Sequence, residues 1–229
     1  MMEFDEQNSP VTSVSTPNEL LSKVFFRMFL GLLATAIAAG YTYYSGLLED
    51  FVARGGYIFC IIAELVVVLV FSLGFRKLSS GVVTALFFAY AILTGITFSS
   101  IFVVFELESI FYAFIGTAAI FGILAYVGKN TTMDLSKFGT ILWITLLVGI
   151  VVSIINLFVG NAMIDIVLDW VILAVFMGFT VYDMNKVIAM QNEGVAESDK
   201  LYIYGAMQLY LDFINMFIRI LMLFGKKRN

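Results

Sequence analysis

The sequence predicts an all-α polytopic membrane protein with seven transmembrane helices, the last of them inside the bundle. Of the 229 residues, 61% are hydrophobic and 13% are charged, and the mean hydropathy is +0.98, whereas about a quarter of the residues in a soluble domain are charged. Seven apolar segments follow one another, each near the roughly 20 residues that a helix needs to cross a bilayer. The last segment alone carries a regular stripe of polar side chains.

The chain divides into a tail, a membrane domain and a short basic end. Residues 1–22 are polar and acidic and contain both prolines, Pro10 and Pro17. We expect them to form a flexible cytoplasmic tail, since they lack the basic start and apolar core of a signal peptide. The membrane domain covers residues 23–225, and residues 226–229 form a basic tail. The expected spans are 24–45, 57–75, 81–105, 109–128, 138–159, 164–190 and 201–224.

The basic residues predict how the spans are oriented. With the N-terminus in the cytoplasm, the inner side holds eight basic residues, and the outer side holds Arg54 and three tail residues, Lys226, Lys227 and Arg228. This favours a cytoplasmic N-terminus, and a compact chain without an organelle address is typical of a bacterial plasma membrane protein. The alternative is a six-span arrangement with a re-entrant last segment, which would bring the basic tail inside.

The last span is the segment around which we expect the bundle to be organised. Gln208, Asp212, Asn215 and Arg219 recur at intervals that stack them on one face of a helix. An ionisable group in hydrocarbon is expensive and normally faces the bundle interior or a water-filled cavity. We therefore expect this helix inside the protein, with its polar stripe lining the path of whatever the protein handles.

Two aspartates are the candidate pH sensor and ion ligands. Asp183 lies ~10 Å from the inner end of its span and Asp212 ~16 Å from the same side, at 1.5 Å per residue, so their carboxylates can meet. Thr180 shares the face of Asp183. Two such groups in a low dielectric cannot readily both ionise, so we expect a shared proton. Deprotonated, they would coordinate calcium transiently; the alternative is a fixed structural pair.

Three further ionisable residues complete the candidate site. Arg76 stands at the inner end of the second span, where it either snorkels to the headgroups or forms an inner latch with one of the aspartates. Glu64 and Arg219 lie ~10 Å and ~8 Å from the outer ends of their spans. Because these depths are similar, we expect the two residues to form an outer ion pair that plugs the centre of the bundle.

The composition excludes several classes of function. The chain has no histidine, which is the usual ligand for haem, zinc or copper and the usual general base. We therefore expect no enzyme activity, no organic cofactor and no stably bound metal. The net charge of -4 suggests no nucleic-acid surface. The expected partners are the lipid bilayer around the apolar spans, and calcium and protons at the aspartate pair. The span glycines, Gly95 and Gly116 among them, are expected to permit close helix packing.

The strings FTVYDMNKV and LYLDFINMF resemble the signature of the transmembrane Bax inhibitor motif family, of the Bax inhibitor-1 type found in bacteria. The resemblance implies a bundle of six helices around a central seventh that acts as a pH-sensitive calcium leak. It also implies that Asp183 and Asp212 are the pH-sensing pair, with Arg76 an approximate match to the family's inner latch. Arg219 does not fit the family pattern securely, so the outer pair depends on the depth estimate alone.

Three other classes of function compete with the calcium leak. A proton-coupled cation exchanger or carrier would use the same carboxylates, although no repeat or proline-broken helix pair marks a midplane site. A non-transporting regulatory membrane protein would leave the polar stripe unexplained. An intramembrane aspartyl protease is disfavoured because Asp212 lies in LYLDF rather than Gly-x-Gly-Asp, and because no proline follows Pro17 to form a Pro-Ala-Leu motif.

Overall fold

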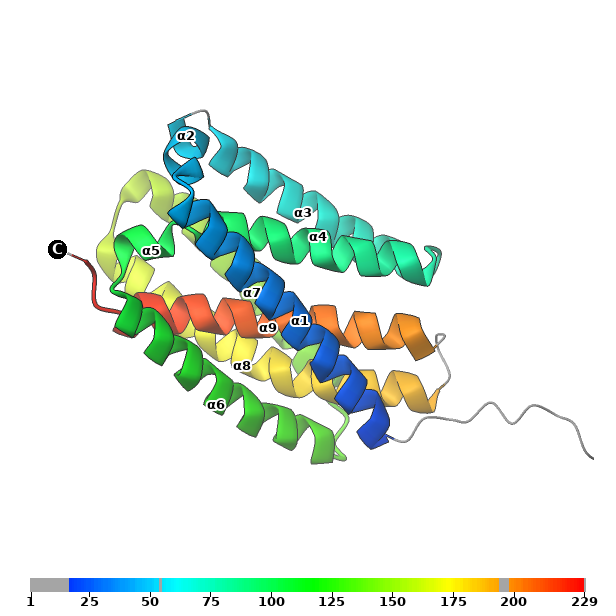
Figure 1. The fold of residues 1–229 in the computed structure, drawn as a ribbon. Coiled ribbons are helices and arrows are strands. Elements are labelled where there is room, and N and C mark those ends of the chain that lie inside the picture. Colours follow the sequence, from blue (N-terminus) through cyan, green and yellow to red (C-terminus); the bar gives the residue numbers. More distant parts are fainter. Residues whose placement is uncertain (1–16, 54, 194–197, 229) are drawn as a thin grey trace, which may run out of the picture.

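The computed structural model describes residues 17–53, 55–193 and 198–228 of the chain. These residues form an all-helical bundle (Figure 1). The helices are α1 (Pro17–Tyr44), α2 (Leu47–Ala53), α3 (Gly56–Gly74), α4 (Ser80–Phe98), α5 (Ile101–Val104), α6 (Leu107–Asn130), α7 (Ser136–Val159), α8 (Ala162–Asn192) and α9 (Ser198–Phe224).

Seven of these helical segments are long and apolar enough to cross a membrane, as predicted. The last is one continuous helix of 27 residues, α9, so the six-span alternative with a re-entrant final segment is wrong. An odd number of spans separates the two ends of the described chain, and Figure 1 shows α1 beginning at the opposite end of the bundle from the C-terminus. We call these the N-terminal end and the C-terminal end of the bundle.

The first helix begins earlier than predicted. Residues 17–22, assigned to the flexible tail, form the first turns of α1, and the rest of the predicted tail, residues 1–16, lies outside the described residues. Proline suits the first helical position because its missing N–H has no partner there in any case. Leu20 and Leu21 are buried, and Glu19 pairs with Lys23 at 2.7 Å. These contacts make the segment part of the bundle.

The third predicted span is interrupted near its C-terminal end, between α4 and α5. The hydroxyl of Ser99 donates to the carbonyl of Ile96, and that of Ser100 donates to the carbonyl of Thr97. Such bonds compete with the helical backbone and favour a turn. The short α2, in a connection that the sequence predicted as loop, also caps this end of the bundle (Figure 1).

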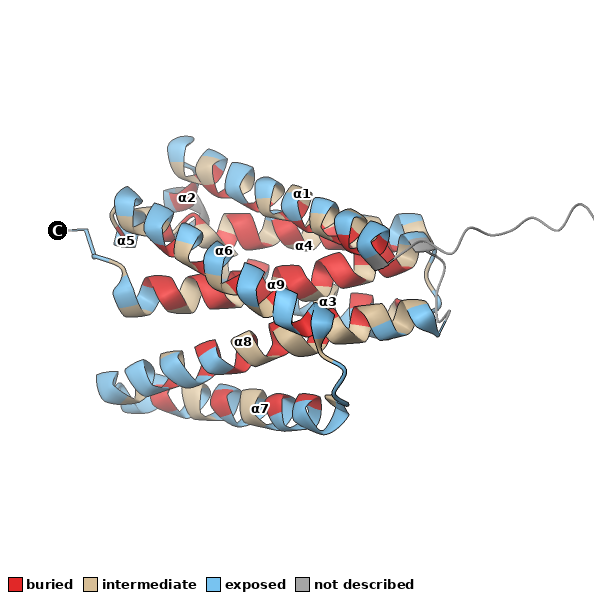
Figure 2. Cartoon of the chain, turned by 90° about the horizontal axis from the view of Figure 1, so that it is seen from below, coloured by how far each residue is buried: buried red, intermediate tan, exposed pale blue. Residues whose placement is uncertain are grey.

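The last helix, α9, is the most enclosed of the spans. In its most apolar stretch 56% of residues are buried, against 11% to 39% for the other six. It packs against α1, α4, α6 and α8, whereas α3 packs mainly against α4, and α7 against α8. In Figure 2, α7 lies on the far side of α8 from α9. The interior position of α9 thus agrees with its polar stripe, but an arrangement of all six other spans around it is not confirmed.

Candidate functional site

The structure places both candidate aspartates on one cavity inside the bundle. This aspartate cavity has a volume of about 100 Å³ and lies between α3, α7, α8 and α9. Helix α8 contributes Asp183, and α9 contributes Gln208 and Asp212. The two aspartates are only 5% and 3% exposed. They are in this position because the 3.6-residue period of each helix turns its polar side chains toward the cavity rather than toward lipid.

Polar contacts within the aspartate cavity are incomplete. The side chain of Gln208 interacts with the carboxylate of Asp183, and the charges of Asp183 and Asp212 act on each other. Within the described chain, Oδ2 of Asp212 has no hydrogen-bond partner. Buried polar atoms are nearly always satisfied, and the cavity is large enough for several water molecules. Oδ2 is therefore available to a proton, a water molecule or a cation.

Aromatic side chains form much of the remaining wall of the aspartate cavity. Trp143 of α7 and Phe176 and Phe179 of α8 line it. The ring centroids of Trp143 and Phe179 are 5.2 Å apart, and those of Phe176 and Phe179 are 5.8 Å apart. These rings make this part of the wall apolar and lower the local dielectric, which strengthens the electrostatic interactions of the two carboxylates.

The base that acts on Asp183 is Lys186, which the sequence pattern had not assigned to the site. Its positive charge acts on Asp183, and its ammonium lies 5.6 Å from the ring centroid of Tyr182 and 5.7 Å from that of Tyr204. Residues three apart on a helix are neighbours on its surface. The spacing of Asp183 and Lys186 was therefore the signal that could have identified this base.

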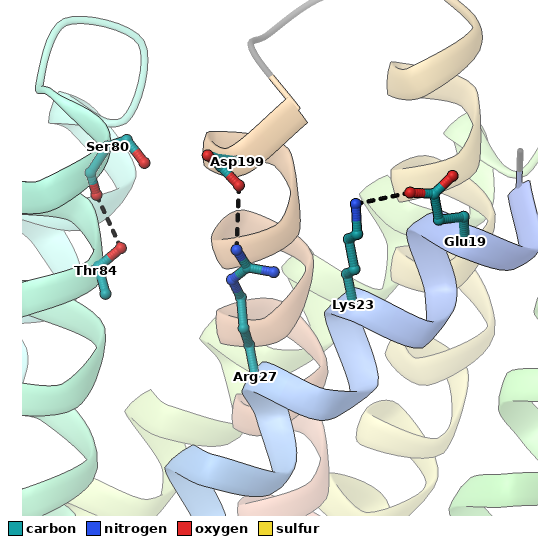
Figure 3. Close-up of polar contacts among 6 residues, drawn as sticks. All are labelled: Glu19, Lys23, Arg27, Ser80, Thr84 and Asp199. Atoms are coloured by element: carbon teal, nitrogen blue, oxygen red, sulfur yellow. Dashed lines mark hydrogen bonds and ion pairs between the residues drawn. The ribbon is translucent and has the colours of Figure 1, made fainter. Parts of the chain in front are cut away.

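The predicted inner latch is not formed in this structure. Arg76 is exposed in the turn between α3 and α4, and in the part of the chain that the structure describes no ion pair joins it to either aspartate. At the N-terminal end, Arg27 of α1 instead donates to Asp199 of α9 at 3.2 Å (Figure 3). Arg27 and Lys23 also lie 5.0 Å and 4.9 Å from the ring centroid of Tyr202.

The predicted outer ion pair is wrong. Arg219 Nη1 lies 2.6 Å from Asp169 Oδ1 of α8, and Glu64 Oε1 accepts a hydrogen bond of 2.6 Å from the hydroxyl of Thr97 of α4. The depth estimate located Glu64 and Arg219 along the membrane normal only. The two side chains point toward different neighbouring helices, because α3 packs against α4 while α9 packs against α8.

The polar stripe of α9 does not line one continuous surface. Gln208 and Asp212 face the aspartate cavity, but Arg219 lines a separate cleft at the C-terminal end. The amide of Asn215 donates to the carbonyl of Leu211 in its own helix at 2.8 Å. Thr180 of α8, expected to line the pathway, likewise donates to the carbonyl of Phe176 at 2.9 Å. Neither Asn215 nor Thr180 lines the aspartate cavity.

Comparison with known proteins identifies the family. Residues 17–229 match the family model described as "Inhibitor of apoptosis-promoting Bax1". The chain belongs to the Bax inhibitor-1 family. It is 36% identical over 234 residues to the "Inner membrane protein YbhL" of Escherichia coli, with all of both chains covered. It is also 32% identical over 217 residues to an uncharacterized protein of Borreliella burgdorferi, covering 93% of this chain and 94% of that one.

Membership of the Bax inhibitor-1 family and seven apolar helices together make the chain an integral membrane protein. The strings that carried the resemblance lie in α8 and α9 and contain the two residues that share the aspartate cavity. The side-chain oxygen ligands that this cavity offers a hard cation are the carboxylates of Asp183 and Asp212, the amide oxygen of Gln208 and the hydroxyl of Ser72. Calcium takes about six to eight oxygen ligands, so water would complete its coordination there.

Proposed function

We propose that this Bax inhibitor-1 family member is a pH-sensitive calcium leak in which Asp183 and Asp212 share a proton and coordinate calcium transiently. One observation carries the proposal. Two buried carboxylates line a single small cavity within a bundle of membrane-spanning helices, and Oδ2 of Asp212 has no partner in the described chain. Intramembrane acids mark ion pathways and proton relays, and the family resemblance supports the same assignment.

Protonation would change the contact between α8 and α9. With one shared proton, the protonated carboxyl donates to the other carboxylate and ties the two helices together. Without it, two negative charges repel each other and attract a cation into the cavity. Lys186, one turn further along α8 toward the N-terminal end of the bundle, supplies a positive charge that competes with the cation for the carboxylate of Asp183. Eight basic residues at the N-terminal end of the bundle, against four at the C-terminal end, favour a cytoplasmic N-terminal end, in a bacterial plasma membrane.

Calcium flux into liposomes tests this proposal. The purified full-length chain is reconstituted with a calcium-sensitive dye inside the vesicles, and influx is measured across a pH series. We expect wild-type flux to depend on pH, and Asp183→Asn and Asp212→Asn to flatten that dependence. Asp134→Asn is the matched control, because this carboxylate lies outside the spans and bonds the backbone N–H of Ser136 at 2.9 Å.

Three results would refute the assignment. Absence of calcium flux at every pH would eliminate the leak and favour a regulatory membrane protein. Saturable counterflow driven by a proton gradient would identify a cation exchanger or carrier instead. If flux occurs but both aspartate variants keep the wild-type pH profile, the shared proton is not the sensor.

A further inference from the structure

A second cavity, the C-terminal cleft, lies between the first turns of α8 and the last turns of α9. Its volume is about 650 Å³, within the range of about 300 to 1,000 Å³ that is usual for ligand pockets. Four charged residues line it, namely Asp165, Asp169, Arg219 and Lys227. None of them lines the aspartate cavity, so a ligand here is independent of the proposed leak site.

Asp165, Asp169 and Arg219 of the C-terminal cleft are each held in place by one partner. Each of these three side chains keeps further hydrogen-bonding capacity for a ligand. Asp165 Oδ1 accepts from the amide of Asn156 at 2.6 Å. Asp169 Oδ1 pairs with Arg219 Nη1, also at 2.6 Å. A carboxylate has two oxygens and can accept about four hydrogen bonds, and a guanidinium has five N–H donors. Nε of Arg219 is buried and has no hydrogen-bond partner in the described chain.

The fourth charge is positioned by the chain that follows α9. The backbone N–H of Lys226 donates to the hydroxyl of Ser109 at 3.0 Å, and its carbonyl accepts from the N–H of Glu106 at 3.0 Å. The N–H of Arg228 donates to the carbonyl of Val104 at 2.9 Å. Residues 226–228, predicted as a basic tail, are thus bonded to the start of α6 and the end of α5.

Adjacent residues of an extended chain point to opposite sides, and the two lysines of this segment follow that rule. Lys226 Nζ pairs with Glu106 at 2.8 Å, while Lys227 lines the C-terminal cleft. No ion pair occupies the Lys227 ammonium in the part of the chain that the structure describes. The bonded segment therefore presents an unpaired cation to a cleft that already contains two carboxylates and a guanidinium.

The rim of the C-terminal cleft suits the boundary between lipid headgroups and acyl chains. Ile166, Trp170 and Met222 line the cleft and are about half exposed. Asp165 and Asp169 lie ~5 Å and ~10 Å from the start of α8 at 1.5 Å per residue, which is the depth of the interface, where tryptophan is also enriched. An amphiphile could place its head among the charges and its chains over the apolar rim.

We propose that the C-terminal cleft binds a phospholipid whose headgroup carries a primary ammonium and a phosphate, as in phosphatidylethanolamine. The carboxylates of Asp165 and Asp169 accept N–H bonds from the ammonium, and Lys227 and Arg219 bind the phosphate. The lining contains two acids and two bases, so a zwitterionic head matches it better than a head with net charge. A quaternary ammonium cannot donate hydrogen bonds, so phosphatidylcholine is a poor ligand.

Tryptophan fluorescence tests this proposal directly. The chain has two tryptophans, and Trp143→Phe leaves Trp170, at the rim of the cleft, as the only reporter. The full chain carrying this change is reconstituted in phosphatidylcholine vesicles that contain a small fraction of lipid with brominated acyl chains, which quench nearby tryptophan. We expect brominated phosphatidylethanolamine to quench Trp170 at lower mole fractions than brominated phosphatidylcholine or phosphatidylglycerol.

Charge variants locate the effect. Loss of one hydrogen bond to a charged group weakens binding by about tenfold, so Lys227→Gln and Asp165→Asn should each raise the mole fraction of phosphatidylethanolamine needed for half-maximal quenching by about that factor. Lys77→Gln is the control, because it removes an exposed lysine of the turn between α3 and α4, which does not line the cleft. Each variant is first checked for the wild-type elution volume in size-exclusion chromatography.

Three outcomes would overturn the proposal. Equal quenching by all three brominated lipids in the parent protein would mean that the cleft does not select a headgroup. Stronger quenching by phosphatidylglycerol would identify a site for an anionic head instead. A preference for phosphatidylethanolamine that survives both Lys227→Gln and Asp165→Asn would place the lipid elsewhere. The quenching assay does not measure calcium flux, so its result is independent of the leak.

Discussion

Replacing Gly95 by alanine should destabilise the bundle, because the backbone of α1 lies close to α4 there. A Cβ atom built at Gly95 would lie 2.5 Å from the carbonyl oxygen of Thr35 and 2.7 Å from Cβ of Ala38. Both belong to α1, and one is a backbone atom, so a side-chain rotation cannot relieve the clash. The hydroxyl of Thr35 lies 2.7 Å from that of Tyr210 of α9, so a shift of α1 would also disturb its contact with α9.

Gly116 is the matched control, since a Cβ atom there would meet nothing within 4 Å. Overpacking costs about 1 to 3 kcal/mol, and alanine gains about 1 kcal/mol over glycine in a helix. Gly95→Ala should therefore lose up to about 2 kcal/mol, while Gly116→Ala should gain up to about 1 kcal/mol. The difference between the two variants equals the overpacking cost of about 1 to 3 kcal/mol, which corresponds to a gap of about 2 to 12 °C in Tm for a chain of this length.

Thermal unfolding in detergent, followed by circular dichroism, measures this gap. Both variants contain the same added methyl group, so the comparison cancels the intrinsic effect of alanine and isolates the contact between α1 and α4. If Gly95→Ala unfolds at the same temperature as Gly116→Ala, or at a higher one, the close approach of the two helices is not a constraint on the bundle.

Two predictions concern the C-terminal end of the bundle. A double-mutant cycle with Arg219→Gln and Asp169→Asn should show a coupling energy of about 1 kcal/mol in thermal unfolding, whereas a cycle with Arg219→Gln and Glu64→Gln should show none; the reverse result would restore the outer pair predicted from depth. The hydrogen bond with Glu106 raises the pKa of Lys226 above its ordinary value of 10.5. The stabilisation that this pair gives the folded chain is therefore complete below pH 10.5 and is lost as the pH rises through the raised pKa. Glu106→Gln should therefore mobilise a spin label attached in residues 226–228 already at neutral pH, and unchanged mobility would contradict a role for the pair in holding the tail.

The spans and the two aspartates could be predicted because both follow from local properties of the chain. Runs of apolar residues indicate where the chain crosses a membrane, whatever surrounds them. The period of the α-helix shows that the polar residues of α9 share one side. The start of α1 was missed because residues 17–22 are polar in composition, yet their leucines are buried by neighbouring helices.

The partners of the charged residues could not be predicted in the same way. Arg219 bonds Asp169 rather than Glu64, and Lys186 rather than Arg76 acts on Asp183. A sequence locates each of these side chains in depth, but it does not specify the rotation of one helix relative to the next. That rotation depends on how side chains from different helices fit together.

By itself, the sequence determined that this is a helical membrane protein, that its last span belongs in the interior, and that two carboxylates lie at compatible depths. Hydropathy and helical periodicity suffice for these conclusions because each depends on one segment at a time. Only the tertiary structure placed Asp183 and Asp212 on a common cavity and Lys227 at a separate cleft. Both placements depend on contacts between segments far apart in the chain, and those contacts exist only in the packed bundle.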